Sequence, residues 1–83
     1  MIDKKFEHKE PIVLVKYQDA GIKEGQHNPK EHPITFVAEV VGFVIKETVS
    51  QIVLTQEIFD DGDCRRSIAI PKVAILNKKV LRK

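Results

Sequence analysis

The chain has 83 residues, 42% of them hydrophobic, and a formal net charge of +2. This length predicts one small domain over residues 1–83, and so small a charge does not by itself indicate a polyanionic partner. The single cysteine, Cys64, excludes an internal disulfide. With neither a signal-peptide core nor an apolar run of bilayer length, we expect a cytoplasmic chain that makes no membrane contact.

The first part of the chain predicts a short helical turn, one strand and a long loop. Asp3 is a suitable cap for a turn over residues 2–10, which Pro11 would end. The β-branched run over residues 12–17 predicts the first strand. Gly and Pro punctuate residues 19–33, which predicts a loop that is long for a compact domain and is therefore mobile or functional.

The longest apolar run, residues 34–46, predicts a strand that bends at Gly42. A glycine inside a β-branched run marks a kink or the close approach of another backbone. A tight turn over residues 47–50 then leads to an antiparallel partner over residues 51–59, where apolar and polar residues alternate.

The last third predicts two more strands. Residues 60–63 carry the Asp-Gly signal of a hairpin tip, and residues 67–70 form a short strand. Pro71 would begin a helical turn over residues 71–74, and the last strand follows over residues 75–81. Five strands in this order predict an all-β fold, a strongly bent, SH3-like small barrel.

Two segments resemble the motifs of Sm and Hfq-like proteins, within a likeness over residues 12–81. Residues 42–54 place a glycine in a bent strand, then a turn, then Gln51-Ile52-Val53-Leu54, which resembles the family's Asn-apolar-apolar-Leu element. Residues 68–75 stand where the second motif, Ile-Arg-Gly before an apolar strand, would stand. The resemblance implies an Sm-like barrel. The chain is also similar to small uncharacterised bacterial and phage proteins with the same Val-Gly-Phe strand and Ile-Pro-Lys segment.

The departures from the Sm motifs fall on the positions that would bind RNA. Thr48 takes roughly the place of an acidic residue, and the spacing from Gly42 to Leu54 is one residue short. Pro71-Lys72 stands where Arg-Gly would bind RNA. The resemblance therefore implies the fold without implying RNA binding.

No catalytic or metal constellation is visible, so we expect a non-enzymatic protein without metal or cofactor. The long loop holds four candidate ligands, Glu24, His27, Glu31 and His32. Their spacing matches no metal signature, so a solvated loop is the simpler interpretation. Residues 60–63 lack the ligand spacing of a calcium loop. Cys64, beside Arg65 and Arg66, has no nearby base.

An apolar surplus on the bent strand predicts self-association. Both parities of residues 34–46 are apolar, whereas a barrel has one inward face, and burying each Val, Ile or Phe yields about 1.5–3 kcal/mol. Edge strands also invite pairing with another chain. We therefore expect a homo-oligomer, a self-assembling binding or structural module. Its interface residues would be Val41, Phe43, Ile45, Ile75 and Val80.

The alternative is a protein that binds single-stranded RNA or DNA. No acidic residue follows Asp63, so the C-terminal quarter is basic. Arg65, Lys72, Lys78 and Lys79 would contact phosphates. Tyr17 or Phe59 would offer a stacking surface for bases. Solvated strand faces and a frayed tail explain the same charges, and the sequence leaves both functions open.

Overall fold

The computed structural model describes residues 9–21 and 24–83. The helical turn predicted over residues 2–10 therefore lies almost entirely outside the described residues. The described chain is all-β, as predicted, and no helix in it is long and apolar enough to cross a membrane.

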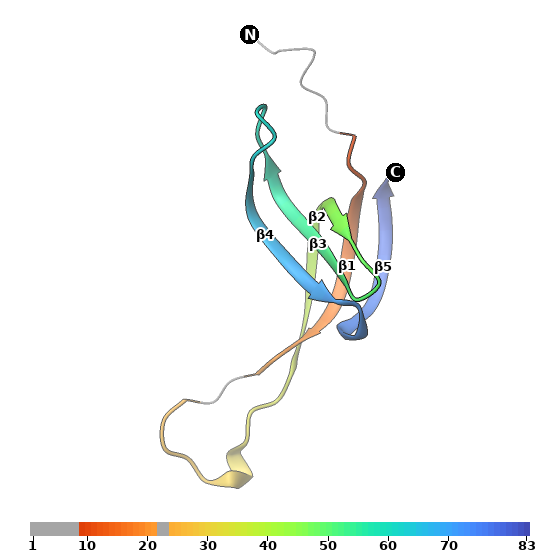
Figure 1. Ribbon diagram of the computed structural model, residues 1–83. Coiled ribbons are helices and arrows are strands. Elements are labelled where there is room, and N and C mark those ends of the chain that lie inside the picture. The colour runs from red at the N-terminus through yellow and green to blue at the C-terminus, as the bar shows by residue number, and fades with distance from the viewer. Residues whose placement is uncertain (1–8, 22–23) are drawn as a thin grey trace.

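Five antiparallel strands form one sheet in the order β4-β3-β2-β1-β5 (Figure 1). The strands are β1 (Ile12–Asp19), β2 (Phe36–Glu47), β3 (Gln51–Ile58), β4 (Cys64–Pro71) and β5 (Ile75–Arg82). Two short 3-10 helices, η1 (Pro29–Glu31) and η2 (Lys72–Ala74), lie between strands. The helical turn predicted before the last strand is confirmed by η2.

The sheet curves but does not close. In the described part of the chain β4 and β5 are the two edge strands and do not pair with each other. Pro71 suits such an edge, because proline has no N–H to donate to a neighbouring strand. The all-β sheet is confirmed, whereas the closed barrel stays a prediction.

Gly42 lies where β2 passes from one neighbour to the other. Residues 36–43 of β2 pair with β1, and the β3 ladder begins at Phe43. A Cβ atom on Gly42 would lie 3.0 Å from the Thr55 carbonyl oxygen and 3.1 Å from the Leu54 Cβ atom. The predicted close approach of another backbone is confirmed, since β3 crosses at this point.

The core lies on the concave face of the sheet. Val13, Val15, Ile52, Leu54 and Ile70 are each at most 2% exposed. Tyr17, Val40, Val44, Ile68 and Ile75 pack against them. The middle of the concave face is thus buried within the chain, and the other face is the convex outer surface.

The described residues 20–21 and 24–35, here called the arm, project beyond the sheet (Figure 1). Gln18 donates a hydrogen bond of 2.6 Å to the Thr35 hydroxyl at the base of the arm. Gly21 lies so close to Ile34 that a Cβ atom would be 1.7 Å from the Ile34 carbonyl oxygen. The arm also contains η1, where the Asn28 side chain accepts a hydrogen bond from the Lys30 amide. The sequence predicted only a loop there.

Candidate interaction surfaces

An apolar patch lies on the convex face of β1 and β2. Directly opposed residues of an antiparallel pair share a face, and the register joins Ile12 to Phe43 and Leu14 to Val41. These four residues, here called the outer patch, alternate with the buried Val13 and Val15. Val41 is 47% exposed and the other three are half-buried.

Charged residues continue the same face beside the outer patch. Lys16 of β1 lies opposite Glu39 of β2, one step along the ladder from Leu14 and Val41. On the other side Arg82 lies over the Phe43 ring, with the guanidinium carbon 5.8 Å from the ring centre. The outer patch is therefore an apolar centre with both signs of charge at its rim.

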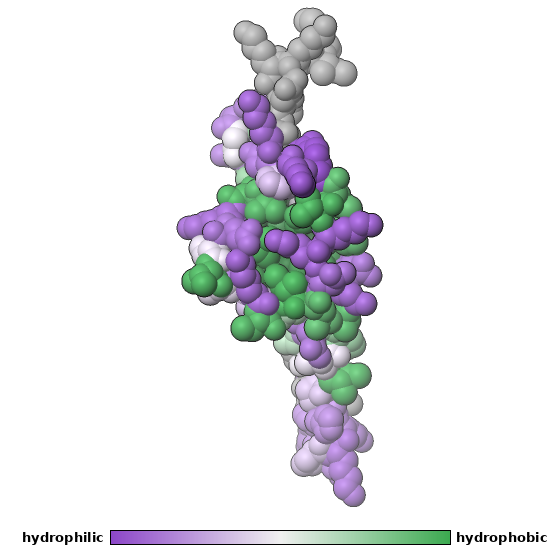
Figure 2. Space-filling view, turned by 90° about the vertical axis from the view of Figure 1, so that its right-hand side faces the viewer, coloured by the Kyte–Doolittle hydropathy of each residue, from purple (hydrophilic) through white to green (hydrophobic). Residues whose placement is uncertain are grey.

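Strand β5 also leaves apolar side chains in solvent. Leu76, Val80 and Leu81 are each about half exposed, at 54%, 47% and 50%. Figure 2 shows the side of the molecule on which β5 lies, where hydrophobic residues gather in the middle among hydrophilic ones. Below them the surface is mostly hydrophilic.

The five predicted interface residues do not share one surface. Val41 and Phe43 come together in the outer patch. Ile45 is 38% exposed at a register shift in β2. Val80 lies opposite Val13 at the far edge, and Ile75 packs against the core.

The four cations predicted to contact phosphates are also dispersed. Lys72 forms an ion pair of 2.8 Å with Glu47. The hydrogen bond from Lys72 is the main cause that holds the pKa of Glu47 below its usual value. The positive charge of Lys78 is a further cause. Lys79 pairs in register with Leu14 on the convex face, and Arg65 lies on β4 at the opposite edge.

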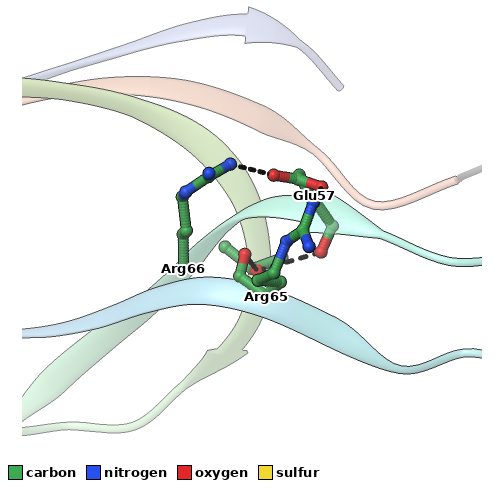
Figure 3. A network of polar contacts seen from close by, with 4 residues as sticks. Glu57, Arg65 and Arg66 are labelled. Atoms are coloured by element: carbon green, nitrogen blue, oxygen red, sulfur yellow. Dashed lines mark hydrogen bonds and ion pairs between the residues drawn. The ribbon is translucent and has the colours of Figure 1, made fainter.

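Arg65 belongs to a polar network on the β3–β4 hairpin (Figure 3). Its guanidinium donates a 2.7 Å hydrogen bond to one carboxylate oxygen of Glu57, and Arg66 forms an ion pair with the other oxygen. The bond from Arg65 is the main cause that lowers the pKa of Glu57, with the charge of Arg66 a smaller one. Arg66 has a positive φ of 60°, a left-handed backbone conformation within β4.

The two predicted stacking aromatics are both engaged within the chain. Tyr17 is half-buried and packs against the core. Phe59 is 41% exposed, with the Arg65 guanidinium carbon 5.4 Å from its ring centre. Tyr17 lies on β1 and Phe59 in the turn between β3 and β4, so the two offer no shared platform for bases.

The two loop histidines each contact a backbone carbonyl oxygen close to them in the chain. His27 contacts the Gly25 carbonyl oxygen at 3.0 Å, and His32 contacts the Pro33 carbonyl oxygen at 3.1 Å. Across the described residues, no group of three or more His, Cys, Asp or Glu side chains is placed to hold a metal ion. Cys64 is exposed at the start of β4.

A groove of about 440 Å³ lies on the concave side, between the end of β1 and β4. Its lining residues are Tyr17, Gln18, Asp19, Ala20, Ile68, Ala69, Ile70, Pro71 and Ala74. Asp19 is the only charged residue among them. No local signal in the sequence predicts this groove, because its two walls are distant in sequence and meet only through the curvature of the sheet.

Comparison of the chain with protein-family models, curated proteins and solved structures finds no match.

Proposed function

We propose that this chain is a non-enzymatic, self-assembling binding module whose copies associate through the outer patch. The observation that supports it is the exposure of Val41. Its side chain is 47% exposed, although it belongs to one of the two adjacent apolar cross-strand pairs of the outer patch. An antiparallel sheet with one buried face normally carries polar residues on the other. A contiguous apolar patch rimmed by polar residues is typical of an interaction site.

The rim of the outer patch favours a second copy as the partner. Lys16 and Glu39 lie side by side, so a twofold contact would bring Lys16 of one copy toward Glu39 of the other. Pairing β5 with β5 of a second copy is disfavoured, because Lys78 and Lys79 would face like charges. The face is thus a better self-association surface than the β5 edge.

An Sm-like barrel is the architecture we propose for this module. Three observations support it: the strand order, the close approach at Gly42, and a single 3-10 turn between the two edge strands. In the described part of this strongly bent sheet β4 and β5 are the edge strands, and neither is paired with the other within one copy.

The test is the molar mass of the wild-type chain and of Val41→Asp by light scattering at micromolar concentration. We expect a mass above that of the monomer for the wild type and a monomer for Val41→Asp. Losing a buried Val costs about 1.5–3 kcal/mol, or at least tenfold in affinity.

Val49→Asp is the matched control. Val49 is 95% exposed in the turn between β2 and β3, away from the outer patch, so this variant should associate as the wild type does. Circular dichroism checks that both variants keep their strands. A monomeric wild type would refute the proposal, as would equal loss of association in both variants.

A further inference from the structure

The groove between β1 and β4 has the size and chemistry of a binding site. Its volume of about 440 Å³ lies within the roughly 300–1,000 Å³ typical of ligand pockets. Ile68, Ile70 and Ala74 supply apolar walls. Asp19 is exposed at one end, and Lys72, the cation next to the lining, is bound to Glu47.

Two aromatic residues flank Asp19 on the concave face. Tyr17 and Asp19 share a face with the buried Val13 and Val15, because alternate residues of a strand point to the same side. Asp19 is the direct cross-strand partner of Phe36, which is 60% exposed. A carboxylate that shares a sheet face with neighbouring aromatic side chains attracts an organic cation, through charge and through the ring faces.

The β4 edge beside the groove offers backbone groups for strand pairing. The Lys72 amide donates a hydrogen bond to the Ser50 carbonyl oxygen. Because every second residue of an antiparallel strand turns its backbone groups to the same side, Ile70 and Ile68 also turn theirs toward β3. Ala69, between them, turns its N–H and C=O toward the outer edge. No other described strand pairs there.

We propose that the groove binds an extended peptide segment of another protein, in which a Lys or Arg is flanked two residues away by apolar side chains. The segment adds a strand to β4 through Ala69. Its apolar side chains then lie against the groove walls at Ile68 and Ala74, and its cation lies among Tyr17, Asp19 and Phe36. Main-chain pairing supplies affinity in this mode, and the side-chain pockets supply specificity.

This binding site goes beyond self-association and lies on the opposite face from the outer patch. The result of the Val41→Asp experiment therefore neither supports nor contradicts peptide binding in the groove. Strand β5 of a second copy is the competing occupant, because Leu76, Lys78 and Val80 repeat the same pattern. Lys78 lies opposite Val15 on the concave face of its own sheet, so a free segment of a partner protein fits better.

The experiment is a positional-scanning library of fluorescent octapeptides, screened by polarisation against the full-length chain. We expect selection of Lys or Arg at one position and of apolar residues two positions to either side. The best peptide should bind Asp19→Asn about tenfold more weakly, the loss of one charge-assisted contact. Phe36→Leu should also weaken binding.

Asp60→Asn and Phe59→Leu are the matched controls, because both residues are exposed on the distant β3–β4 hairpin. They should bind the best peptide as the wild type does. The Ala69 amide should also gain protection from hydrogen exchange when the peptide is bound.

Three results would overturn the proposal. One is a library with no preference for a cation, and another is an Ala69 amide that is no better protected with peptide. The third is tightest binding by a peptide copying residues 75–82, which would make the groove a contact between copies.

Discussion

Gly42 shows how a single position without a side chain allows two strands to come close together. It is buried between β1 and β3, and the Thr55 carbonyl lies 3.0 Å from the place of a Cβ atom. Real Cβ atoms rarely come so close to another heavy atom. Glycine is therefore required at this position by packing rather than by a positive φ, which Gly42 does not have.

We expect Gly42→Ala to lower the free energy of unfolding by about 1–3 kcal/mol, the usual cost of overpacking. Removing a glycine restricts the unfolded chain, which by itself would stabilise the fold by about 0.4–1 kcal/mol. The clash with β3 should outweigh this gain. Urea denaturation measures the difference.

Ser67→Ala is the control for Gly42→Ala. Ser67 is exposed on β4, so its replacement should change stability by no more than about 0.5 kcal/mol. Equal stability of Gly42→Ala and the wild type would show that β3 can move aside at no cost.

At the scale of an element, the β3–β4 hairpin is joined by the Glu57 network. The lowered pKa of Glu57 means that its ionised form favours the folded state. This contribution is present above the pKa of Glu57 in the unfolded chain. It is lost as the pH falls through the lower pKa of the folded chain.

We predict that Arg65→Gln raises the pKa of Glu57 toward its usual value more than Arg66→Gln does. Both arginines contact the carboxylate, but the hydrogen bond from Arg65 is the larger cause of the shift. NMR titration of the Glu57 carboxyl group measures both variants. A larger effect of Arg66→Gln would contradict the prediction.

The existence of the five strands could be predicted from the sequence, because β-branched runs and turn residues are local signals. Their ends could not. β4 begins at Cys64 rather than at residue 67, because Cys64 and Arg65 pair with Ile58 and Glu57. The segment Cys64-Arg65-Arg66 has no strand pattern of its own, so only its partner reveals it.

The groove was harder to predict than the strands. Tyr17 in its lining and Phe36 outside the lining are 19 positions apart, and only the β1–β2 register places Phe36 beside Asp19. Helix η1 is different, because Asn28 before Pro29 is a recognisable capping signal that the sequence analysis read only as part of a loop.

At the scale of the whole molecule, the charges are separated by the topology. β4 and β5 are adjacent in sequence but lie at opposite edges of the sheet, so Arg65 is far across the sheet from Lys78 and Lys79. Within β5, Lys78 and Lys79 are consecutive and point to opposite faces. The basic C-terminal quarter of the sequence is therefore not one basic surface.

This separation predicts weak binding to single-stranded nucleic acid. A groove that follows the phosphates needs several cations in a row, and affinity falls with salt by a slope of about 0.7 for each phosphate neutralised. Lys72 and Arg65 would each have to leave a carboxylate to contribute. We expect the wild-type chain to elute from a single-stranded RNA or DNA column without retention at about 0.15 M salt.

Lys79→Glu is the variant that makes the column experiment decisive. Lys79 lies on the convex face beside the outer patch, so its reversal should leave the elution volume unchanged if nucleic acid is not a ligand. Retention of the wild type at low salt, with a steep salt dependence that Lys79→Glu reduces, would instead favour a nucleic-acid binder. The convex face would then serve phosphates rather than a second copy of the chain.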